Sequence, residues 1–182
     1  TVNGVRLQET APASDRVVVL NTRLLFADAN DGGKVRSWIF EGCTSAGHSF
    51  SPLSDLFVTL TCFEVNVPHT KIIRISLETG EYEEIFRTNA IIQGSSPKIS
   101  PDGNLIAFAL NNDGSNWDAF QDLALIDPKS GEIVQRLRPS ENQGLAPSSE
   151  YFWAADGKSV YVTARASGLD EVWSLSLSGD HH

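Results

Sequence analysis

The stretch PKISPDGNLIAFALNNDGSNWDAFQDLALIDPKSGE, residues Pro97–Glu132, indicates the fold of the chain. It predicts short strands at Lys98–Ser100, Leu105–Leu110 and Leu123–Asp127, separated by clusters of turn-forming residues. In the first turn, Pro101 presets φ, Asp102 can bond to its own backbone, and Gly103 accepts a positive φ. The stretch therefore predicts a meander of antiparallel strands with tight turns.

The same pattern occurs twice more in the chain. The segment that leads into the first turn is matched by Ser49–Pro52 and Phe152–Gly157, and the later turn is matched by Leu77–Glu81 and Leu177–Asp180. The central strand Leu105–Leu110 is apolar on both faces, which a strand packed between two neighbouring sheets requires. A period of roughly 40 to 50 residues with four short strands in each repeat is typical of a β-propeller blade.

We therefore predict an all-β fold, an incomplete β-propeller of about three to four blades with four antiparallel strands each. A terminal arm is expected at 1–15, and blade-like units at about 16–46, 47–92, 93–146 and 147–182 of a single propeller segment. In the first unit we expect a turn at Asn21–Thr22 and a hairpin loop at 28–33. The last unit stops before a fourth strand, so a second copy or the rest of a longer polypeptide is expected to complete the ring.

Composition excludes several classes of partner. The 182 residues carry a formal net charge of −9, which argues against a nucleic-acid backbone or an anionic membrane surface. No apolar run is long enough for a transmembrane helix. The chain contains no Met and begins without a leader pattern, so we expect a mature or excised segment. Cys43 and Cys62 either form a bridge in an oxidising compartment or remain buried thiols.

The segments Ser100–Phe108 and Asp122–Glu132 together resemble the repeat of TolB-like propellers, which is also the WD40-like repeat of the N-terminal propeller in prolyl oligopeptidase-family (S9-type) peptidases. The resemblance covers residues 47–180, about three quarters of the chain. It implies a propeller that sits over an α/β-hydrolase domain, gates substrate access and anchors peptide ends.

No catalytic motif accompanies this resemblance. The chain has no G-x-S-x-G nucleophile elbow, because neither Gly94–Ser96 nor Ser167–Gly168 fits it. No Ser-His-Asp triad has motif support. We therefore expect this chain alone to be non-catalytic, and whether a longer parent protein is a serine peptidase stays open.

Three residues are candidates for substrate binding. His48 is expected on an innermost strand, where it can face a central channel, whereas His69 is expected on a loop. Glu64 begins a hairpin loop from which an acidic side chain could bind a free amino terminus, as the resemblance implies. Trp117 could supply a stacking surface. The loops at 28–33 and 111–118 contain Asn and Asp but lack calcium-loop spacing, so we expect no metal and no cofactor.

Two functions of different classes follow. The first is a non-catalytic propeller segment of an oligopeptidase-like serine hydrolase, which gates substrate access and docks the catalytic domain. The second is a TolB-like propeller that acts as a protein–protein interaction module with a peptide or protein ligand. A propeller lyase or lactonase with a channel metal would need several His or carboxylate ligands that the chain does not show. The compartment, periplasmic, secreted or cytoplasmic, stays open.

Overall fold

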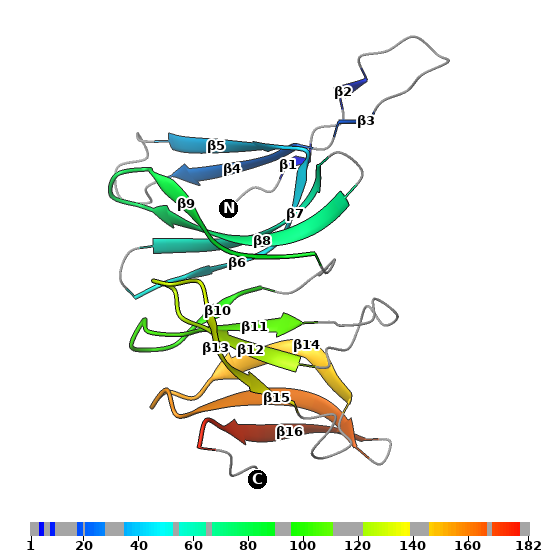
Figure 1. The fold of residues 1–182 in the computed structure, drawn as a ribbon, viewed down its shortest axis with the longest axis vertical. Helices are drawn as coiled ribbons and strands as arrows, with labels where there is room; N and C mark the ends of the chain where they lie inside the picture. The colour runs from blue at the N-terminus through cyan, green and yellow to red at the C-terminus, as the bar shows by residue number, and fades with distance from the viewer. Residues whose placement is uncertain are drawn as a thin grey trace.

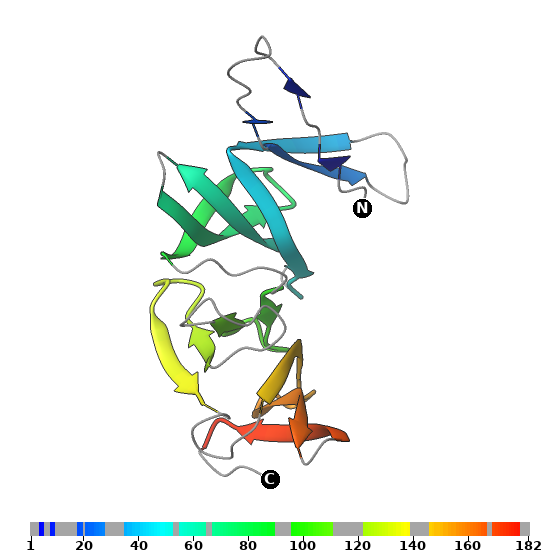
Figure 2. The ribbon, with the colours of Figure 1, turned by 90° about the vertical axis from the view of Figure 1, so that its right-hand side faces the viewer.

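The computed structural model describes residues 4–5, 8–9, 18–19, 21–27, 35–52, 55–64, 67–89, 96–110, 122–138, 146–166 and 169–178. Throughout these ranges the regular structure is β-strand, with no helix, and every strand pair is antiparallel. The larger sheets follow one another in a stack from the N-terminal to the C-terminal part of the chain (Figure 1 and Figure 2). The chain is thus an all-β, incomplete propeller, as predicted.

The third sheet agrees most closely with the sequence prediction. Its strands lie in the order β10-β11-β12-β13, which is also their order in the chain. The bounds are β10 Lys98–Ile99, β11 Ile106–Leu110, β12 Asp122–Ile126 and β13 Ile133–Leu137. Every residue of β11 and β12 is buried, so both central strands pack on both faces.

The second and last sheets repeat this meander. The second consists of β6 Cys43–Phe50, β7 Asp55–Glu64, β8 Val67–Ser76 and β9 Tyr82–Thr88. The last consists of β14 Ala146–Trp153, β15 Ser159–Ala166 and β16 Leu169–Ser176. Among the described residues β16 has no fourth strand beside it. The inner strand β10 contacts both β6 and β14, so the three inner strands share one side of the stack.

The first sheet differs from the prediction. It has the order β1-β4-β5, with β1 Gly4–Val5, β4 Asn21–Ala27 and β5 Val35–Glu41. The expected turn at Asn21–Thr22 is wrong, because both residues lie in β4 and pair with Glu41 and Phe40. Part of the expected arm also forms structure: β2 Gln8–Glu9 pairs with β3 Val18–Val19 in a short ribbon that projects from the stack (Figure 1).

The turns form as the sequence predicts. Gly103 has φ 76° and its N–H donates to the Ser100 oxygen at 2.9 Å. The Ser100 hydroxyl donates to Asp102 Oδ1 at 2.6 Å and accepts the Leu105 N–H at 2.9 Å. This hydrogen bond from Ser100, together with those from Asn104, lowers the pKa of Asp102 to about 2. The equivalent turn of the last sheet has Ala154 in place of the serine, and Gly157 N–H donates to the Ala154 oxygen at 3.0 Å.

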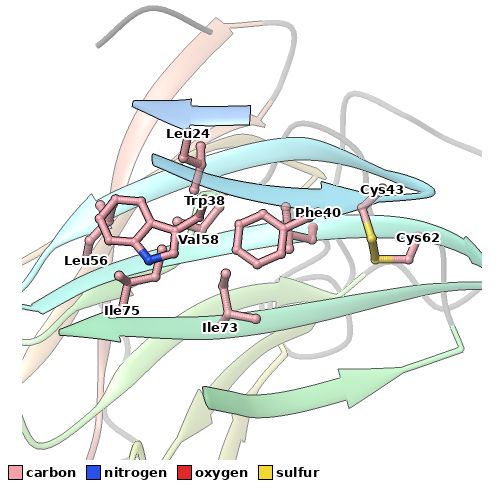
Figure 3. Packing of buried hydrophobic residues seen from close by; sticks show 10 residues of the cluster. Leu24, Trp38, Phe40, Cys43, Leu56, Val58, Cys62, Ile73 and Ile75 are labelled. Carbon is pink, nitrogen blue, oxygen red and sulfur yellow. A yellow bond between two sulfur atoms is a disulfide. The ribbon is translucent and has the colours of Figure 1, made fainter. Parts of the chain in front are cut away.

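The hydrophobic core lies between successive sheets and comprises three clusters. The cluster between the first and second sheets contains Leu24, Trp38, Phe40, Leu56, Val58, Ile73 and Ile75 (Figure 3). The cluster between the second and third contains Phe57, Ile72, Ile106, Phe108 and Ile126. The cluster between the third and last contains Leu123, Leu125, Tyr151, Val160 and Val162. Stacked sheets that bury both faces in this way are the architecture of propeller blades.

An outer contact recurs from sheet to sheet. Arg36 in β5 donates to the oxygens of Leu77 and Glu78, which follow β8 of the next sheet. Gln135 in β13 donates to the oxygen of Leu177, which follows β16, at 3.0 Å. Between the second and third sheets the approach is so close that a Cβ on Gly131 would overlap the main-chain oxygen of Ile85. Each outer strand is therefore held by the last turn of the sheet that follows.

A disulfide joins Cys43 and Cys62, which are register partners on β6 and β7 (Figure 3). Both half-cystines are buried within the cluster between the first and second sheets. The sequence left two alternatives for these cysteines, a disulfide or buried thiols, and the structure contains the disulfide. The described residues include no helix with the length and apolarity needed to cross a membrane.

Candidate functional site

Of the three predicted site residues, the structure describes the side chain of His48 only. His48 lies in β6, an inner strand, as expected. Glu64 is the final residue of β7, and its side chain lies outside the described part of the chain. Trp117 falls within 111–121, which is also outside the described residues. Their roles in substrate binding stay predictions.

His48 lines an apolar niche between the first and second sheets. The half-buried imidazole meets the ring of Phe50 edge-on, with 6.2 Å between the ring centroids. The niche has a volume of about 30 Å³, enough for one water-sized or methyl-sized group. Its lining residues are Leu24, Leu25, Phe26, Trp38, His48, Phe50, Leu56 and Val58. His48 is thus the one titratable side chain on an otherwise hydrophobic wall.

The equivalent positions of the last sheet are filled. Tyr151 pairs with Val162 as His48 pairs with Val58, and Tyr151 is fully buried. Its hydroxyl donates to the oxygen of Ser96 at 2.6 Å and accepts the Ala109 N–H at 3.3 Å. Two residues later, Trp153 Nε1 donates to the oxygen of Lys98 at 2.8 Å. In the last sheet, two inner-strand side chains therefore bond the main chain of the preceding inner segment.

A buried ion pair occurs at the other end of the third sheet. The Asp122 carboxylate, in β12, accepts a hydrogen bond from Arg136 at 3.1 Å, and Arg138 Nε lies 3.7 Å from it. Asp122 is 4% exposed, and a buried carboxylate is costly unless cationic groups such as these two pair with it. The two guanidinium groups are partly exposed, and the buried Asp122 carboxylate is already paired with both of them.

His69 corrects a sequence prediction. It lies in β8 rather than on a loop, is 4% exposed, and is the register partner of Cys62. Its Nε2 has no hydrogen-bond partner among the residues that the structure describes. Within the same residues, no group of three or more His, Cys, Asp or Glu side chains could hold a metal ion.

The free face of the last sheet carries exposed apolar side chains that the sequence did not predict as a site. Phe152, Tyr161 and Val172 are 55%, 42% and 70% exposed. Tyr161 takes the register position of Ala107, and Val172 that of Leu123, both of which are fully buried in the third sheet. Aligning the repeats residue by residue would have revealed the difference, because a position that is covered in one blade carries an aromatic ring in the next.

The free face of the first sheet has a different character. Arg23, Ser37 and Glu41 are exposed there, and Ile39, at 59% exposed, is its only large exposed apolar side chain among the described residues. The corresponding strands of the second sheet present Ile73 and Ile75 to the sheet before them. Among the described residues this face is thus a mixed polar and apolar surface.

No family model matches the chain, and no curated protein matches it. A solved structure of similar fold comes from Bacteroides fragilis, a protein whose name assigns it provisionally to the 6-phosphogluconolactonases. The two share 16% identity with a TM-score of 0.49, over 90% of this chain and 47% of the other. This chain therefore spans about half the length of that protein.

These findings correct the expected resemblance. The assignment to TolB-like or prolyl oligopeptidase-family propellers is wrong: no family model supports it, and the similar solved structure carries the name of a lactonase. The all-β, propeller-like architecture remains. The activity of the similar protein is that protein's own, since a likeness at this level describes fold alone.

Proposed function

We propose that this chain is a protein–protein interaction module, and that the free face of its last sheet binds the face of another β-sheet. The observation that carries the proposal is the exposure of Tyr161 and Val172 at positions that the preceding sheet buries, next to the exposed ring of Phe152. Exposed aromatic and aliphatic side chains grouped on one face are characteristic of interaction surfaces.

The stack itself supports the kind of partner. Three successive interfaces in this chain are each made by one antiparallel sheet packing on the next. A partner sheet on β14–β16 continues that series. The centre of the face carries uncharged Thr163 and Ser174 beside the apolar side chains, and Lys98 Nζ lies 5.7 Å from the centroid of the Phe152 ring. The partner that the test supplies is a second copy of the chain.

The test is solution mass as a function of concentration, by light scattering on a sizing column. We expect the wild-type chain to self-associate, and the triple variant Phe152→Ser, Tyr161→Thr, Val172→Thr to run as a monomer with an unchanged far-UV spectrum. The matched control is Ile39→Thr, which removes an equally exposed side chain from the opposite end of the stack and leaves the association unchanged. A wild-type chain that remains monomeric at all concentrations, or a triple variant that associates equally, overturns the proposal.

A further inference from the structure

The free face of the last sheet presents five uncharged side chains in two adjacent rows. Phe152, Tyr161 and Ser174 are register partners across β14, β15 and β16. Thr163 and Val172 form the next row on the same face, because side chains two residues apart along a strand project from the same side. We refer to these five residues as the uncharged patch. Its centre lies on β15, the middle strand of the sheet.

The free face of the first sheet is a poor partner for this patch. Ile39 is the register partner of Arg23, and Glu41 lies two residues from Ile39 on the same strand. Arg23 and Glu41 are both exposed. A sheet that packed over Ile39 would therefore remove two charged groups from water, which is costly unless each gains a partner of opposite charge. The uncharged patch has no charge to offer either of them.

The cation beside the uncharged patch lies at its edge. Lys98 Nζ is 5.7 Å from the centroid of the Phe152 ring. Lys98 belongs to β10 of the third sheet, and β10 contacts β14, which is an edge strand of the last sheet. A partner centred on β15 can thus leave this ammonium group at the rim of the contact, where charged groups remain in water.

We propose that the uncharged patch binds the same patch of a second copy, so that the last sheets of two chains pack face to face about a two-fold axis near their middle strands. This inference rests on the proposed function and specifies which face of the partner is bound. In such an isologous contact, a residue near the axis meets its own copy. Each chain has its patch occupied in the dimer, so association ends at two chains, whereas packing of the last sheet on the first sheet of the next copy would form a ring or a filament.

Crosslinking of single-cysteine variants tests this arrangement. The two cysteines of the chain, Cys43 and Cys62, are bonded to each other, so an introduced cysteine supplies the reactive thiol. Thr163→Cys places the thiol on the middle strand of the patch, and the matched control Ser37→Cys places it on the free face of the first sheet. With a short bismaleimide, we expect Thr163→Cys to form a crosslinked dimer and Ser37→Cys to remain monomeric. Phe152→Ser should weaken dimer formation by about tenfold or more, because each dimer loses two rings from the contact.

A mixture of the two cysteine variants distinguishes the ways in which the inference can fail. Mass spectrometry of the linked peptides identifies the joined chains, and we expect links between two Thr163→Cys chains alone. Links between a Thr163→Cys chain and a Ser37→Cys chain, or a solution mass that rises beyond two chains, overturn the two-fold arrangement and leave the proposed function standing. A wild-type chain that stays monomeric overturns both.

Discussion

The interface between the third and last sheets and the interface between the first and second sheets are built from the same repeat but are held differently. In the former, Tyr151 and Trp153 connect two inner strands through hydrogen bonds to main-chain oxygens. In the latter, His48 and Phe50 border a niche, and a disulfide joins β6 to β7 within the core. Among the described residues, the second sheet thus carries a covalent link between two of its own strands where the last sheet has hydrogen bonds to the sheet before it.

The largest effect is expected from Tyr151. Tyr151→Ala removes a fully buried ring and leaves the Ser96 oxygen and the Ala109 N–H without their bonds, so the free energy of unfolding should fall by about 4 kcal/mol. His48→Ala, at the equivalent position of the half-open niche, should cost about 1 kcal/mol or less. Urea unfolding followed by circular dichroism measures both. Equal losses would show that the niche is as tightly packed as the closed interface.

The disulfide gives the next largest effect. Cys43 and Cys62 are 19 residues apart in sequence, and a loop of this length corresponds to about 3 kcal/mol of stabilisation through the unfolded chain. The double variant Cys43→Ala, Cys62→Ala should lower the free energy of unfolding by about that amount in urea titrations. The wild type unfolded in the presence of a dithiol should match the double variant. A double variant as stable as the oxidised wild type would show that the disulfide does not stabilise the fold.

The outer contacts allow a smaller, paired comparison. Arg36 binds two main-chain oxygens with a charged guanidinium, whereas Gln135 binds one with a neutral amide. Charged hydrogen bonds are the stronger kind, so Arg36→Ala should destabilise by about 2 kcal/mol and Gln135→Ala by about 1 kcal/mol. Thermal unfolding of the two variants under identical conditions tests the order. A reversed order would mean that the charge of Arg36 is already compensated by water.

The sequence predicts the third sheet closely because its signals are local. Pro101, Asp102 and Gly103 define the turn, and the apolar run Ile106–Leu110 is buried throughout. The first sheet could not be predicted in the same way, because Asn21–Thr22 has turn-forming composition but is held in β4 by pairing with β5. That pairing is a tertiary contact, and it overrides local preference.

The functional surfaces were harder to predict for a related reason. Exposure of Phe152 and Tyr161 depends on whether a further sheet covers them, which no local pattern encodes. His48 was identified from its position on an inner strand, and the structure places it there. The family resemblance failed because turn chemistry repeats in many propellers: Ser100–Gly103 specifies a hairpin, and a hairpin does not specify a family.

The smallest expected effect distinguishes the turns of the third and last sheets by their pH dependence. The pKa of Asp102 is lowered to about 2 by hydrogen bonds from Ser100 and Asn104. A carboxylate with a lowered pKa stabilises the fold above its unfolded value of about 3.9 and loses that contribution as the pH falls toward 2. The urea midpoint of the wild type should therefore decrease from pH about 4 to about 2, and Asp102→Asn should reduce this decrease.

The last sheet supplies the control for this measurement. Its turn has Ala154 where the third sheet has Ser100, so Asp156 receives the Lys158 N–H but no serine hydroxyl. Ser100→Ala removes the hydroxyl that donates to Asp102 and gives the third-sheet turn the residue found at Ala154, so it should reduce the acid decrease in the urea midpoint as Asp102→Asn does. If Ser100→Ala leaves the pH profile unchanged while Asp102→Asn flattens it, the serine hydroxyl is not what separates the two turns.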